Sequence, residues 1–156
     1  MGKSLFLTVI YVVCSLCYMA AQGLVNVKHY SVKDGMSQNT VQGVLQDNEG
    51  YIWMATWNGL EKFDGYSFKN YKTYPTDKVK LQYNRLVNLQ LGGNQMLVCQ
   101  SYDRRVYLFD IRRECFEDVF AYHPEVKLCT AASKIITLPN GMVWIVGTNG
   151  DLWRID

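Results

Sequence analysis

Histidine is nearly missing from this chain of 156 residues, although it is the commonest metal ligand and a frequent general acid or base in catalysis. The two histidines, His29 and His123, lie far apart. Neither has an acidic residue, a cysteine or another histidine at the spacing of metal ligands. No Gly-x-Ser-x-Gly or other nucleophile signature is present. We therefore expect no catalytic residue, no metal site and no cofactor, and we interpret His29 as an exposed strand residue.

An excess of charge of either sign is also lacking. Lysine and arginine number 16 against 14 aspartates and glutamates, which gives a formal net charge of +2 with both signs interspersed. This balance leaves no electrostatic footprint for a nucleic acid, so we expect no nucleic-acid partner. Short basic spots such as Arg104 with Arg105 are more simply interpreted as solvated turns.

Cysteines are too few for a disulfide framework if the first 21 residues are removed. Those remaining would be Cys99, Cys115 and Cys129, and an odd number allows at most one intrachain bridge with one thiol left over. Each has apolar or aromatic neighbours in the sequence, so we expect small buried hydrophobic side chains. Whether any two of them form a disulfide is left open.

Long hydrophobic runs are limited to one, at the amino terminus. Lys3 precedes an apolar block over 5–19, which is followed by the small residues Ala20 and Ala21. This order is typical of a secretory signal peptide, and a membrane span would need about 20 apolar residues. We expect a signal peptide over 1–21, cleavage after Ala21, export from the cytoplasm, and no membrane span in the mature chain.

What the sequence does contain is a repeat. The segments "LEKFD", "VYLFD" and "LWRID" place Asp64, Asp110 and Asp156 at intervals of 46 residues. A second apolar run precedes each of them, namely "YIWMAT", "QMLVCQ" and "MVWIVGT". Residues that recur in this way usually cap turns. The pattern predicts one structural unit used three times.

Turn residues between these runs predict antiparallel hairpins. Asn58-Gly59 and Asn149-Gly150 separate the two runs in the first and third units, and Asn-Gly favours a type I′ turn with positive φ at both residues. Further strand candidates flank the hairpins. The expected strands cover 40–47, 51–56, 60–64, 66–72, 85–91, 95–100, 106–110, 114–122, 132–138, 142–148 and 152–156.

Four short strands in each unit of about 46 residues are typical of a propeller blade. We expect an all-β fold, a β-propeller fragment of about three four-stranded blades over 22–156, with Trp53 filling the space between blades. The expected blades cover approximately 24–72, 73–118 and 119–156.

The first unit resembles the repeat of the two-component regulator propellers, the exported sensor region of hybrid two-component receptors. The third unit matches moderately and the second is degenerate, with Cys99 near the tryptophan position. Met36 and Ala55 replace the usual leucine and glycine. The matching residues of the first unit are Gly35, Ser37, Asp47, Gly50, Ile52, Trp53, Thr56, Gly59, Leu60, Phe63, Asp64 and Gly65.

The resemblance implies a sensor that binds a glycan outside the cell and passes altered propeller packing through the membrane to a histidine kinase. No kinase region is present in this sequence, so we expect the amino-terminal part of a longer receptor anchored in the inner membrane. Its partners would be the remaining blades, the kinase region and an oligosaccharide. A homodimer of the parent receptor is left open.

The hairpin tips hold the candidate ligand-binding residues Trp57, Asn58, Tyr102, Arg104 and Asn149. If the tips share one face, they form a polar and aromatic rim, in which an aromatic ring stacks on a sugar and an amide bonds its hydroxyls. The alternative is that Trp57 only packs at its tip. Two other functions stay open: a propeller enzyme, either a polysaccharide lyase or a hydrolase, and an interaction scaffold.

Overall fold

A computed structural model describes residues 2–3, 6–8, 10–12, 26–74, 77, 81–93, 95–118 and 131–155. Residues 2–3, 6–8 and 10–12 are helical, and a short 3-10 helix, η1, covers Val32–Asp34. None of the helices in this part of the chain is long and apolar enough to cross a membrane. The predicted cleavage point after Ala21 lies outside the described residues, as do His123, Cys129 and Asp156.

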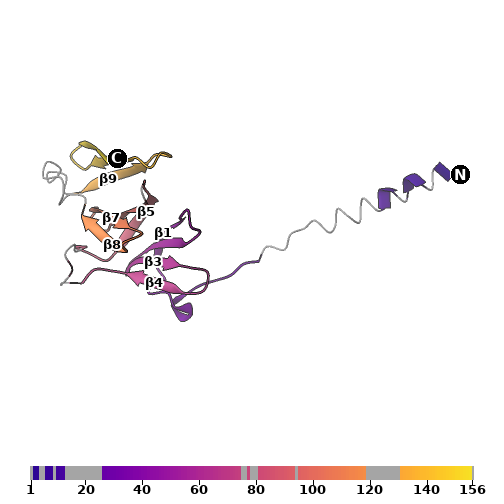
Figure 1. Cartoon of the computed structure of the whole chain (residues 1–156), viewed down its shortest axis with the longest axis horizontal. Coiled ribbons are helices and arrows are strands. Elements are labelled where there is room, and N and C mark those ends of the chain that lie inside the picture. The colour runs from indigo at the N-terminus through magenta and orange to yellow at the C-terminus, as the bar shows by residue number, and fades with distance from the viewer. Residues whose placement is uncertain are drawn as a thin grey trace.

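The described strands form three antiparallel sheets, stacked in chain order in Figure 1. In each sheet, strands that are consecutive in the sequence are hydrogen-bonded neighbours. The first sheet contains β1 (Val41–Gln46), β2 (Ile52–Thr56), β3 (Gly59–Phe63) and β4 (Phe68–Tyr71). The second contains β5 (Leu86–Leu91), β6 (Met96–Ser101), β7 (Val106–Asp110) and β8 (Cys115–Asp118). The third contains β9 (Ala132–Thr137), β10 (Val143–Gly147) and β11 (Leu152–Ile155).

The all-β prediction and the strand predictions are confirmed, with strand ends differing by one or two residues. The exception is the range 114–122, of which only the part up to residue 118 is described. The agreement arises because turn residues fall at the ends of these strands and apolar residues alternate with polar ones along them.

The sheets pack face to face, the first on the second and the second on the third. Trp53 of the first sheet is fully buried, and its ring centroid lies 5.5 Å from that of Phe109 in the second sheet. A second cluster joins Val98 and Val106 to Ile135 and the rest of the third sheet. Close aromatic pairs add about 0.5–1.5 kcal/mol beyond their buried area. The prediction that Trp53 fills the space between units is confirmed.

The first strand of every sheet contains a β-bulge near its beginning. The register skips one residue in each case: Gln42, Val87 and Ser133. A bulge adds local twist to a strand, so the same distortion recurs in all three sheets. Because these three residues share no chemical type, the sequence carries no signal for the bulge.

The Asn-Gly turns differ from the predicted type I′ geometry. Gly59 and Gly150 have φ values of 106° and 91°, but neither Asn58 nor Asn149 has a positive φ. Each loop is therefore a type I turn followed by a left-handed residue, the usual three-residue hairpin. Arg104, with φ 68°, takes the same left-handed position in the second sheet.

The recurring aspartates cap turns, as predicted, where they are described. Asp64 Oδ1 accepts hydrogen bonds from the amides of Tyr66 and Ser67 at 2.8 and 2.7 Å. Asp110 Oδ1 accepts from the amides of Arg112 and Arg113 at 2.8 and 2.9 Å. These bonds lower the pKa of the Asp64 carboxyl and, together with the Arg113 side chain, that of Asp110.

Two smaller predictions need correction. Cys99 is buried, as expected, but Cys115 is exposed because it begins β8 directly after a turn, and both thiols are free. His29 is exposed but lies outside any strand. It belongs to the segment that precedes η1, where Tyr30 packs on Phe63 and Phe68 at centroid distances of 4.9 and 5.6 Å.

Candidate ligand-binding site

In each sheet one hairpin tip joins the second strand to the third, and the three tips lie at one end of the stack. Each tip starts with an amide that bonds to the residue before the first strand of its own sheet. The bonds are Trp57 N to Thr40 O at 3.3 Å, Tyr102 N to Arg85 O at 2.9 Å and Thr148 N to Ala131 O at 3.0 Å. We call this region the tip end, defined by residues 57–59, 102–105 and 148–150 with Arg85.

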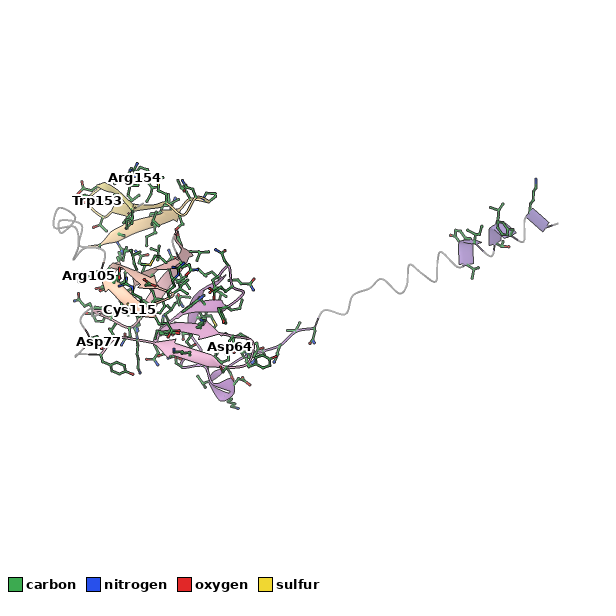
Figure 2. All side chains as sticks on the ribbon, in the orientation of Figure 1. Asp64, Asp77, Arg105, Cys115, Trp153 and Arg154 are labelled. Atoms are coloured by element: carbon green, nitrogen blue, oxygen red, sulfur yellow. The ribbon has the colours of Figure 1, made fainter. Side chains whose placement is uncertain are left out.

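The tips of neighbouring sheets are also joined to one another. The amide of Ala132, at the start of β9, donates to the carbonyl of Arg104 at 2.9 Å. The buried Gln100 amide donates to the carbonyl of Ala132 at 2.8 Å and to that of Arg104 at 3.3 Å. In Figure 2, Arg105 of the tip end and Asp64 of the β3–β4 turn are labelled on opposite sides of the sheets. The hydrogen bonds place the second tip beside the start of the third sheet at this end of the stack.

Arg85 connects the first two tips, although the sequence singled it out for no role. Its guanidinium carbon lies 4.5 Å from the ring centroid of Trp57 and 5.7 Å from that of Tyr102. Trp57 keeps 41% of its surface exposed and Tyr102 keeps 64%. The structure thus brings Trp57, Tyr102 and a cation together at the surface, an arrangement stabilised by attraction between the cation and the ring faces.

Buried hydroxyl groups fix the shape of the first two tips. Thr56 Oγ1 accepts from the amide of Asn58 at 3.0 Å and donates to the carbonyl of Gly59 at 2.9 Å. In the second sheet, the hydroxyl of Ser101 bonds to the Asp103 carboxylate and to the carbonyl of Arg105. Both hydroxyl residues are fully buried. The exposed side chains at the tips are therefore held on a rigid backbone, which lowers the entropy lost on binding.

The five predicted residues are not equivalent in the structure. Trp57, Tyr102 and Arg104 expose their side chains at the tip end. Asn58 is half-buried, and its carbonyl accepts from Asn70 Nδ2 at 3.0 Å. Asn149 uses its side chain within its own loop, since its Nδ2 donates to Asp151 Oδ2 at 2.5 Å and its Oδ1 accepts from the Asp151 amide at 3.2 Å.

Two hollows contain no residue of the tip end in their linings. One, of about 600 Å³, is lined by Tyr71, Phe109 and Glu114 between the first and second sheets. Glu114 accepts from Tyr71 Oη at 2.7 Å and from Lys69 Nζ at 2.5 Å. The Lys69 bond, followed by the Tyr71 bond, lowers the pKa of Glu114, while burial and Glu114 raise the pKa of Tyr71. These groups bind each other across the sheet interface.

The other hollow, of about 500 Å³, lies at the opposite end of the sheets from the tips and is lined by the first turn of each sheet. Asp47 belongs to its lining, but both carboxylate oxygens are already used. Oδ1 accepts from the amides of Glu49 and Tyr51, and Oδ2 accepts from Trp53 Nε1 at 2.7 Å. Within the described residues, no group of three or more His, Cys, Asp or Glu side chains is placed to hold a metal ion.

Comparisons with solved structures identify proteins of similar fold. The chain has a TM-score of 0.63 to a structure from B. thetaiotaomicron described as the extracellular domain of a hybrid two-component system, with 20% identity over 83% of this chain and 20% of that one. A second such domain from the same organism gives a TM-score of 0.52, with 23% identity over 78% of this chain and 16% of that one. This chain therefore shares the fold of the matching part of each of these domains.

One curated protein also matches over part of the sequence. It is Histidine kinase P4 of Formosa agariphila, 41% identical over 54 residues, which are 35% of this chain and 4% of that protein. No protein-family model matches the chain. The chain thus spans one fifth or less of each of these relatives.

Proposed function

We propose that this chain is a ligand-sensing part of the exported region of a hybrid two-component receptor, and that it recognises a saccharide at the tip end. The three sheets are then successive blades of a β-propeller, and residues 1–21 are its signal peptide. The sensor domain is periplasmic, its parent is anchored in the inner membrane, and its partners are the remaining blades and the kinase region.

The observation that carries the proposal is the gathering of Trp57, Arg85 and Tyr102 from two sheets at one exposed end. Aromatic rings beside hydrogen-bonding groups are the usual composition of a carbohydrate site. The likeness to extracellular domains of hybrid two-component systems and to a histidine kinase supports the sensor role. Sensing further requires that the ligand bind two arrangements of the receptor with different affinity.

A binding experiment with a matched control tests the proposal. The full chain is applied to a glycan array, and each hit is measured by calorimetry and checked for product formation. Trp57→Ala is expected to weaken binding about tenfold or more, because burying a large apolar side chain against a ligand contributes about 1.5–3 kcal/mol. Tyr66→Ala is the control, since Tyr66 is also aromatic and 96% exposed but lies in the β3–β4 turn at the other end.

Three outcomes decide the matter. Binding without turnover that depends on Trp57 and not on Tyr66 supports the proposal. Release of a shortened or unsaturated product would instead favour the propeller enzyme. Equal losses in both variants, or no saccharide binding at all, would rule out saccharide recognition at the tip end.

A further inference from the structure

Three of the described arginines belong to the tip end. Arg85, Arg104 and Arg105 form no ion pair with any carboxylate in the described part of the chain. The turn between β7 and β8 shows the contrast. There Arg113 pairs with Asp110 at 2.7 Å and with Glu117. Within the described residues, Arg113 is therefore neutralised by carboxylates, whereas the three arginines of the tip end are not.

The acidic side chains described in the tip end and next to it, Asp103 and Asp151, are already bound by neutral donors. The Asp103 carboxylate accepts from the hydroxyl of Ser101, and the Asp151 carboxylate accepts from the amide of Asn149. Neither reaches the guanidinium of Arg85. These described neighbours therefore leave the positive charge of Arg85 uncancelled, and its guanidinium can donate two parallel hydrogen bonds to an anion.

The position of Arg85 also changes what the aromatic rings can do. A sugar usually stacks on an open ring face, but one face of Trp57 has the guanidinium 4.5 Å from its centroid. A guanidinium held over a ring face can direct its N–H groups outward, away from the ring. This orientation suits the paired oxygens of a carboxylate or a sulfate group.

We infer that the saccharide recognised at the tip end is anionic, carrying carboxylate or sulfate groups, and that Arg85 is the residue that selects for the charge. This inference rests on the proposed function. In the proposed complex, Arg85 binds the anionic group, and the exposed faces of Tyr102 and Trp57 contact the sugar ring that carries this group. Arg104 and Arg105 add attraction for a second anionic group along the chain of sugars.

The test compares four probes on the full chain by calorimetry. They are heparin oligosaccharides, which carry sulfate; oligogalacturonate, which carries carboxylate alone; neutral xylo-oligosaccharides; and polyphosphate, which carries charge without sugar. We expect at least one of the acidic saccharides to bind and the neutral one to bind at least about tenfold more weakly. Raising NaCl from about 50 to about 300 mM should weaken the acidic complex.

Three variants locate the effect. Arg85→Gln is expected to lower affinity for the acidic saccharide about tenfold or more. Arg85→Lys should retain only part of the affinity, because lysine keeps the charge but cannot donate two parallel hydrogen bonds from a planar group. Arg113→Gln is the matched control, since it removes the same charge at the opposite end. A thermal melt of each variant confirms that the sheets are intact.

The outcomes separate this inference from the proposed function. Tight binding of the neutral saccharide, unchanged in Arg85→Gln, overturns the anionic inference and leaves saccharide sensing in place. Equal losses in Arg85→Gln and Arg113→Gln, or polyphosphate binding as tightly as the best saccharide, would mean that charge alone is attracted, and overturn it as well. The absence of any saccharide binding overturns both.

Discussion

Left-handed backbone positions explain why the second repeat looks degenerate at the level of single residues. The described residues with positive φ that are not glycine are Gln95, Arg104 and Glu114, and all three lie in turns of the second sheet. Gln95 and Arg104 take the positions that glycine takes in the first and third sheets. The turn geometry is therefore kept while the glycine is lost. Each such residue costs about 1 kcal/mol relative to glycine.

Arg104→Gly should relieve the backbone strain at this position. Relief of the strain should raise the free energy of unfolding by about 0.5–1 kcal/mol. The greater entropy of glycine in the unfolded chain offsets part of this gain. Arg104→Ala removes the same side chain but keeps the strain, so it should give no increase. Urea denaturation followed by tryptophan fluorescence measures both. Equal stabilities for the two variants would show that the left-handed position carries no strain.

At the scale of elements, the sequence predicted the strands but not their distortions. Strand positions follow from alternation and from turn residues, which are local signals, and Asp64 with Asp110 marked their turns for the same reason. The bulges are set by how neighbouring strands pair, so no residue type announces them. Arg85 was missed because its contacts with Trp57 and Tyr102 arise only when two sheets stack.

Contact between turns of neighbouring sheets gives an element-scale prediction. The Gly93 amide donates to the Gly141 carbonyl at 2.8 Å, and a Cβ added at Gly141 would lie 2.5 Å from the Gly93 Cα. Gly141→Ala is therefore expected to destabilise the fold by about 2–4 kcal/mol, through backbone strain together with a forced separation of the second and third sheets.

Gly150→Ala is the control for that substitution. Gly150 has a similar φ of 91°, but an added Cβ would have no atom within 4 Å. It should show the strain alone, about 1 kcal/mol. Chemical denaturation of the two variants side by side gives the difference. If Gly141→Ala destabilises the fold no more than Gly150→Ala does, the turns at Gly93 and Gly141 are not close enough to exclude a Cβ.

At the scale of the whole molecule, the two outer sheets are covered to different degrees. The segment before β1 lies on the outer face of the first sheet, where Tyr30 packs on Phe63 and the Ser37 amide donates to the buried Glu61 carboxylate. The outer face of the third sheet exposes Ile136 by 38% and Leu152 by 59%. Stacked units of this kind bury apolar surface chiefly against their neighbours.

The third sheet should therefore make the isolated chain self-associate or bind an apolar dye. We expect an elution volume that depends on concentration in light-scattering chromatography, together with enhanced fluorescence of an added naphthalene sulfonate dye. The double variant Ile136→Lys and Leu152→Glu should roughly halve the dye signal, because it replaces the exposed apolar groups with charge. Val27→Lys is the control, since Val27 is 83% exposed but belongs to no sheet. A monomer at all concentrations, with a cooperative melt and no dye binding, would show that this face needs no neighbouring sheet and would weaken the proposal that further blades pack against it.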